Sequence, residues 1–185
     1  MLRVLIAYGG HRVPNHKLVD ELWPDAEGDA AANALKTTLH RLRKLLGRDD
    51  AVQLREGQVS LNPAWVWVDR WALEQCFQAV DTATASPPRT RVLHSMDTVS
   101  HLVRSLYRGR FLEKTDLPCA LRPREILHRK YLRAIERLGE YYERIGMYEK
   151  AASCYEQAVG VDPAAERMYK KLLSCTNAET RTPMP

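Results

Sequence analysis

The stretch "ALKTTLHRLRKLLG", residues 34–47, decides how this sequence is interpreted. Asp29 can cap a helix here and Gly47 can end it, so we expect an α-helix over residues 30–47. No acidic residue interrupts the cationic run from Lys36 to Arg48. The buried stripe of this helix is predicted from leucines at spacings of four, three and four: Leu35, Leu39, Leu42 and Leu46. Two interpretations follow: a core helix with a solvated basic face, or a face that holds a phosphate backbone and reads bases.

Composition limits the classes of protein that this chain can belong to. It has 185 residues, 45% of them hydrophobic, and a net charge of +5. It can therefore bury a core in one domain or two small ones, and its charge permits a nucleic-acid partner without requiring one. The four cysteines form no CxxC pair, which argues against a zinc ribbon or a disulfide framework and fits a reducing cytosol. No apolar run could span a bilayer, so we expect a cytoplasmic protein without a membrane partner.

The first part of the chain has the order of elements of a winged helix-turn-helix. Two short helices are predicted before the quoted one, over residues 2–8 and 16–22, with Asn15 as a cap of the second. After it, "AVQLREGQVSLNP" alternates apolar and polar residues around Glu56-Gly57, which predicts a β-hairpin. In this hairpin two apolar pairs match, namely Val52 and Leu54 with Val59 and Leu61. We expect residues 1–66 to form a winged helix-turn-helix domain.

The second part, residues 67–185, is predicted to be α-helical. Helices are expected over residues 69–80, 92–107, 123–145, 148–159 and 164–175, the third of them begun by Pro123. In "AIERLGEYYERIGMYEKAASCYEQAVGVDP", small residues stand where two helices would approach closely, at Gly139 and Ala151. Tyr142 and Tyr155 would fill the gap between them. This pattern resembles a tetratricopeptide repeat, and one repeat needs neighbours to bury its face.

The basic face of the quoted helix suits DNA. A solvated helix usually mixes Glu with Lys because like charges at i,i+4 repel. Here a phosphate backbone would compensate that repulsion. Arg can grip guanine edges or phosphate, Lys holds phosphate, and Thr and His make shorter polar contacts. The candidates for the major groove are Lys36, Thr37, His40 and Arg41. The candidates for phosphate contacts are Arg43, Lys44, Arg48 and, on the hairpin, Arg55.

Several segments together resemble a known family: "HKLVDELWPD", "AANALKTTLHRLRKLLG", "VQLREGQVSLNP" and "VWVDRWALEQ". They are similar to the OmpR-type winged helix joined to a bacterial transcriptional activator domain, as in SARP-type and MalT-like regulators. The resemblance implies that residues 34–47 are the recognition helix and that the hairpin is the wing. Members of the family carry a small β-sheet before the first helix, whereas this chain begins inside that helix. We therefore expect a natural short form or a piece of a longer chain, with a hairpin that lacks its partner strand.

These observations predict a DNA-binding transcriptional regulator, an activator by resemblance. The helical half would serve for a homodimer, a regulatory domain or RNA polymerase, since family members often bind direct repeats as dimers. The alternative is a protein–protein interaction module with a degenerate winged helix that binds no DNA.

An enzyme has no support in the residues, because no nucleophile–base pair and no Gly-rich phosphate loop is present. His94 and His101 have no nearby Cys or acidic ligand in the sequence, so we expect no metal, and likewise no cofactor and no catalytic residue. Trp65, Trp67 and Trp71 could form a platform for bases. We expect at least two of them to pack the joint between the two halves of the chain instead, because large aromatic side chains anchor cores.

Overall fold

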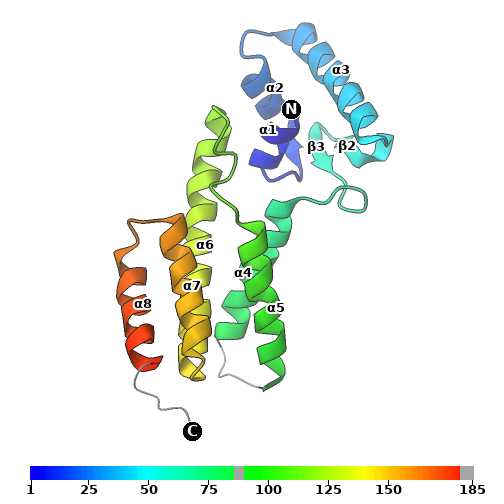
Figure 1. Ribbon diagram of the computed structural model, residues 1–185. Coiled ribbons are helices and arrows are strands. Elements are labelled where there is room, and N and C mark those ends of the chain that lie inside the picture. Colours follow the sequence, from blue (N-terminus) through cyan, green and yellow to red (C-terminus); the bar gives the residue numbers. More distant parts are fainter. Residues whose placement is uncertain (86–89, 180–185) are drawn as a thin grey trace. The chain divides into compact units, whose positions relative to one another are not determined.

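The structure, a computed structural model, describes residues 1–85 and 90–179, and leaves out the side chains of residues 90–95 and 178–179 (Figure 1). The described chain is mainly α-helical with one small three-stranded antiparallel sheet, which confirms the predicted class at that level. It divides into two compact units. The first comprises Met1–Val68 and Phe111–Ile126, and the second comprises Asp69–Arg110 and Leu127–Pro185.

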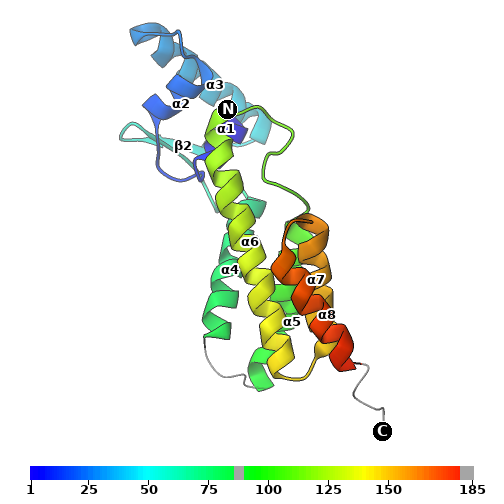
Figure 2. The same cartoon turned by 90° about the vertical axis from the view of Figure 1, so that its left-hand side faces the viewer.

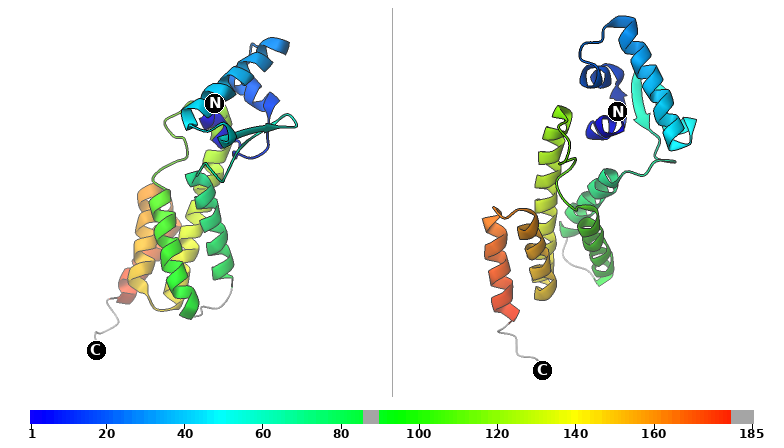
Figure 3. Two further views of the ribbon diagram at one scale, coloured as in Figure 1. Left: turned by 90° about the vertical axis from the view of Figure 1, so that its right-hand side faces the viewer. Right: turned by 45° about the horizontal axis from the view of Figure 1, so that its top comes forward.

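The first unit begins with three helices and three short strands. Their bounds in chain order are α1 (Leu2–Ala7), β1 (Val13–Pro14), α2 (Asn15–Leu22), α3 (Gly28–Leu46), β2 (Val52–Arg55) and β3 (Gln58–Leu61). A short 3-10 turn, η1 (Asp49–Ala51), leads into β2. Helices α2 and α3 pack together, and β2 lies against α3 (Figures 1 and 3).

Helix α3 buries the stripe that its leucine spacing predicts. Ala31, Leu35, Leu39 and Leu42 are buried, and Leu46 is half-buried. Gly47 ends the helix in the left-handed conformation, with φ of 72°, as predicted.

The start of α3 differs from the prediction. The helix begins at Gly28, so Asp29 lies in its first turn, where a negative charge favours the helix dipole, instead of capping it. Asn15 is likewise the first residue of α2, because Pro14 occupies the cap position.

The predicted hairpin register is confirmed. Val52 pairs with Leu61 and Leu54 pairs with Val59. The turn residues Glu56 and Gly57 have φ of 50° and 70°, the conformation of a type I′ turn.

The expectation that the hairpin lacks a partner strand is wrong. Strand β1 pairs with β3, so that Val13 faces Val59 and the strand order is β1-β3-β2. Only two residues form β1, too few to show alternation in the sequence.

The second unit is built from helices. Their bounds are α4 (Asp69–Thr84), α5 (Thr90–Leu106), α6 (Pro118–Arg144), α7 (Tyr148–Val161) and α8 (Glu166–Glu179), of which α6 begins in the first unit. Helices α4 and α5 lie side by side, as do α7 and α8 (Figures 1 and 2). The prediction that Pro123 begins α6 is wrong, because Pro118 takes the first helical position and Pro123 lies inside the helix.

The close packing predicted between α6 and α7 is confirmed. A Cβ atom on Gly139 would overlap the Tyr155 ring, which leaves space there for glycine alone. Ala151 is fully buried beside the tyrosines, and Tyr142 is 2% exposed. Ion pairs then join α6 to α8, from Glu136 to Arg167 at 2.8 Å and from Glu140 to Lys171 at 2.7 Å.

Candidate nucleic-acid interface

The outward face of α3 carries most of the predicted contact residues. Within the described chain, the exposed ones among them make no side-chain hydrogen bond and no ion pair. Their donors are therefore available to a partner from outside. The exposed residues of this set are Lys36, Thr37, His40, Arg41 and Lys44.

Arg43 is placed differently from its neighbours. It is half-buried, and its Nε donates a hydrogen bond of 2.8 Å to the carbonyl oxygen of Val52. This bond holds the last turns of α3 against the first residue of β2. Arg43 thus braces helix to hairpin, a contact that helical periodicity could not indicate.

Arg48 is engaged inside the same unit. Its Nε donates to the Asp50 carboxylate at 3.1 Å, and this bond lowers the pKa of that carboxyl. Its guanidinium lies over the Trp65 ring, 3.4 Å from the ring centroid. The charge of Arg48 is therefore partly matched within the chain, which makes it a weaker candidate for phosphate than Lys44.

The tryptophans near this site differ in exposure. Trp65 is 51% exposed and Trp67 is 71% exposed, while Trp71 is half-buried. The expected packing at the joint between the two halves stays a prediction, but these exposures show that Trp65 and Trp67 are not packed in the core of the first unit. One reason is visible at Trp65, whose ring is covered by the guanidinium of Arg48 instead of by apolar side chains.

The hairpin carries a second group of polar residues. Arg55 is exposed at the end of β2, opposite Gln58. Gln58 accepts a hydrogen bond of 3.0 Å from Nε of Arg12, whose backbone N–H donates to the Ser60 hydroxyl. Sequence reasoning missed Arg12, because only the pairing of β1 with β3 brings it to the hairpin.

Asn33 is a further residue that the sequence analysis passed over. It lies on α3, is exposed, and makes no hydrogen bond within the described residues. The signal was present in the sequence, since Asn33 is four residues before Thr37 and therefore shares its helical face.

The second unit matches a family of known proteins. The family model described as the bacterial transcriptional activator domain matches residues 68–182 of this chain. The chain belongs to the bacterial transcriptional activator domain family. A search of curated proteins finds no match. The family match supports a role in transcription regulation, while α3 and the hairpin lie outside the matched residues.

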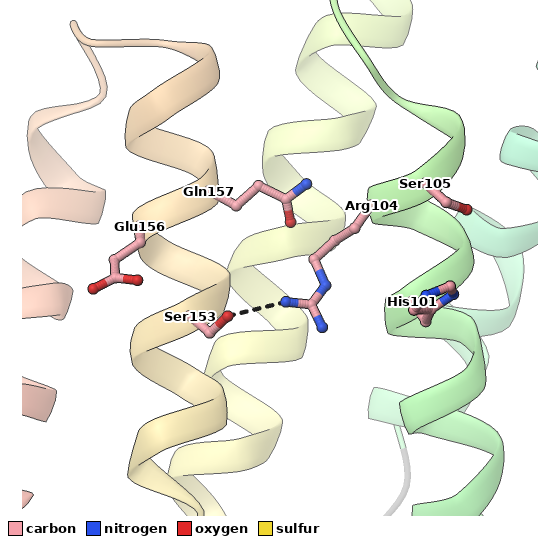
Figure 4. A pocket seen from close by; sticks show the side chains of 6 residues that line it. All are labelled: His101, Arg104, Ser105, Ser153, Glu156 and Gln157. Carbon is pink, nitrogen blue, oxygen red and sulfur yellow. Dashed lines mark hydrogen bonds between the residues drawn. The ribbon is translucent and has the colours of Figure 1, made fainter.

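The activator domain has a polar groove along α5 and α7 (Figure 4). In it, Arg104 on α5 donates to the Ser153 hydroxyl on α7 at 3.0 Å, and Glu156 lines the groove from α7. One turn or more away, the Asp97 carboxylate accepts hydrogen bonds from Tyr142 at 2.7 Å and Lys150 at 2.8 Å. Both cations and acids line the groove, and several of them are hydrogen-bonded within it. Its charges therefore favour neither an anionic nor a cationic ligand.

The described residues hold neither a candidate metal site nor a membrane-spanning helix. No cluster of three or more His, Cys, Asp or Glu side chains is placed to hold a metal ion there. His101 is exposed on α5, and the side chain of His94 lies outside the described residues. Within the same part of the chain, no helix combines the length and the hydrophobicity needed to cross a bilayer.

Proposed function

We propose that this member of the bacterial transcriptional activator domain family binds double-stranded DNA through α3 and thereby activates transcription. The observation that carries the proposal is the outward face of α3 from Asn33 to Lys44, an exposed surface of cations and hydrogen-bond donors without an acid. The exposed Asp29 lies in the first turn of α3, before this stretch. Its Lys36, Arg41 and Lys44 have no ion-pair partner in the described chain, so their mutual repulsion is uncompensated until an anion binds. A duplex supplies such an anion along its whole length.

The arrangement of the first unit supports a winged helix-turn-helix. Helix α2 packs on α3 as the first helix of such a motif does, and the β2–β3 hairpin follows the candidate recognition helix. Strand β1 supplies the partner that the hairpin needs, so the wing does not depend on a sheet before α1. We assign the hairpin residues Arg55 and Arg12 to the DNA backbone or the minor groove beside it.

The second unit takes a regulatory role in this proposal. We interpret its α6–α7 pair, which packs closely at Gly139, as a tetratricopeptide-like repeat. Such repeats present surfaces to proteins. We assign it to a homodimer contact or to a contact with a regulatory domain or RNA polymerase. No catalytic residue, cofactor or metal has a part in this function.

Contacts within the chain reduce the number of phosphates that we expect the domain to bind. Arg43 and Arg48 are engaged within the chain, so the phosphate contacts fall mainly on the exposed cations. Each neutralised phosphate contributes about −0.9 to the slope of log K against log salt. We expect a slope of roughly −3 to −5. The exposed cations that we assign to this role are Lys36, Arg41, Lys44, Arg55 and Arg12.

Fluorescence anisotropy with a random duplex, titrated across salt, tests the proposal. The double variant Arg41→Glu, Lys44→Glu should lose most of the binding. A matched control, Arg129→Glu with Lys170→Glu, changes the net charge equally at exposed positions of the second unit. The control should bind like the unchanged chain. Equal losses in both variants would mean that only net charge matters, and no binding at low salt would refute the proposal.

A protein–protein interaction module is the second candidate, and one observation favours it. On α8, Tyr169 is 42% exposed and Leu173 is 63% exposed, four residues apart on one helical face. Under this alternative the chain binds no duplex at low salt, and Leu173→Glu weakens its association in analytical ultracentrifugation. The charge reversals on α3 would then leave that association unchanged.

A further inference from the structure

Helix α3 has a crest directly opposite its buried stripe. At 3.6 residues per turn, residues spaced by threes and fours stay close to one line along a helix. The buried line is Ala31, Leu35, Leu39 and Leu42, and the opposite line is Asn33, Thr37, His40 and Lys44. Lys36 and Arg41 lie on the two flanks of that crest. If α3 enters a major groove, the first part of the crest faces the base edges, while the flanks and Lys44 at the end of the crest face the phosphates.

Asn33 is the residue on this crest that the fold of the chain does not explain. It interrupts a run of alanines, with Ala30, Ala31, Ala32 and Ala34 around it. Asn is a poorer helix former than Ala, and a mid-helix Asn commonly bonds to nearby backbone. Among the described residues Asn33 has no such partner. It therefore weakens α3 without a compensating contact inside the chain.

The alanines also give α3 two halves of different width. The residues next to Asn33 in sequence, Ala30 to Ala32 and Ala34, have methyl side chains, whereas the half from Arg41 onward carries long cationic side chains. A slim half lets the helix backbone come close to the base edges, within reach of a short side chain. The wider half meets phosphates with longer side chains. In this arrangement the Asn33 amide reaches a base, and the Arg41 guanidinium reaches the phosphate backbone at the side of the groove.

We propose that Asn33 reads an adenine in the major groove, while Lys36 and Arg41 grip the phosphates on either side. This inference rests on the proposed DNA-binding function. An Asn amide offers one donor and one acceptor, which match N7 and the N6 amino group of adenine as a bidentate pair. Guanine presents two acceptors, N7 and O6, at the same edge. The Asn33 amide would therefore lose one hydrogen bond, and its oxygen would face the O6 oxygen of the base. The sequence alone had put Lys36 and Arg41 among the base contacts.

The test uses the full chain and a duplex site selected by it from a random pool. Each base pair of that site is replaced in turn, and affinity is measured by anisotropy at fixed salt. For the unchanged chain we expect one A·T to G·C replacement that costs about 5- to 150-fold in affinity through Asn33. Asn33→Ala should bind both versions equally and still discriminate at the other positions. Its fold is not at risk, because Ala suits a helix better than Asn.

The outcomes separate this inference from the function on which it rests. If the unchanged chain binds no duplex, the proposed function fails and the inference falls with it. If it binds but Asn33→Ala keeps every base preference, the inference alone is wrong. Affinity of Asn33→Ala for a random duplex should stay within about twofold, because phosphate contacts are intact. Gln75→Ala, which removes an exposed amide from α4, is the matched control and should keep all preferences.

Discussion

At the scale of single residues, Gly139 sets how closely α6 and α7 approach. A Cβ at this position overlaps the Tyr155 ring, which is itself fully buried and cannot move aside freely. We expect Gly139→Ala to destabilise the protein by about 1–3 kcal/mol, the usual cost of overpacking. Urea denaturation followed by circular dichroism measures this cost.

The chain contains its own control for that substitution. Gly160 lies in α7 with open space where a Cβ would stand. Gly160→Ala should be neutral or stabilise by up to about 1 kcal/mol, because Ala suits a helix better. If both substitutions changed stability equally, helix propensity and not the Tyr155 contact would account for the first.

At the scale of helices and strands, side-chain hydrogen bonds join neighbouring elements, and Arg43 makes one of these bonds between α3 and β2. We expect Arg43→Ala to lower the free energy of unfolding by about 1–2 kcal/mol, because the Val52 carbonyl loses a charged donor. Lys44→Ala, one residue along and exposed, should change stability by less than about 0.5 kcal/mol. Duplex binding should respond in the opposite order, with Lys44→Ala reducing the salt slope by about 1. If Lys44→Ala lost as much stability as Arg43→Ala, the two residues could not be divided into one that holds the fold together and one that binds DNA.

A buried polar chain joins α6 to the ends of α5 and α7. His128 is 4% exposed, and its Nε2 lies 3.1 Å from an Asp162 carboxylate oxygen, which can only accept. Its Nδ1 lies 3.0 Å from the Tyr107 hydroxyl, to which it is hydrogen-bonded. Each polar group in this chain is paired, which is the condition under which burying it costs little.

That chain makes stability depend on pH on the acid side. The hydrogen bond from His128 lowers the pKa of Asp162 below its usual value of about 3.9. The stabilisation is therefore present above that value and is lost as pH falls through the lower folded-state pKa. We expect Asp162→Asn to cost on the order of 1 kcal/mol near neutral pH, and the difference to shrink as pH falls below about 4. Unfolding free energies measured between pH 3 and pH 7 test this, and a difference that is constant over that range would contradict it.

At the scale of the whole molecule, periodicity predicted the parts that depend on local sequence. The leucine stripe of α3, the hairpin register and the Gly139–Tyr155 contact all follow from spacing and side-chain size. Strand β1 and the hydrogen bond from Arg43 to Val52 could not be predicted, because each exists only once separate elements have packed together. The exposed crest of α3 was predictable only in part. Its spacing can be read from the sequence, but only the structure shows that the Asn33 side chain has no partner among the described residues.

The first compact unit is not continuous in sequence, so the domain predicted as residues 1–66 covers only part of it. The unit also includes Phe111–Ile126, in which the backbone N–H of Cys119 donates to Glu21 at 3.1 Å and Ala120 is fully buried. We expect the fragment 1–66 to protect its α2 and α3 amides from hydrogen exchange less than the full chain does, since it lacks these contacts. The full-length variant Glu21→Gln, which keeps the segment and weakens one bond, should fall between the two. Equal protection in fragment and full chain would mean that residues 1–66 are a domain in their own right, and that the later segment only rests on them.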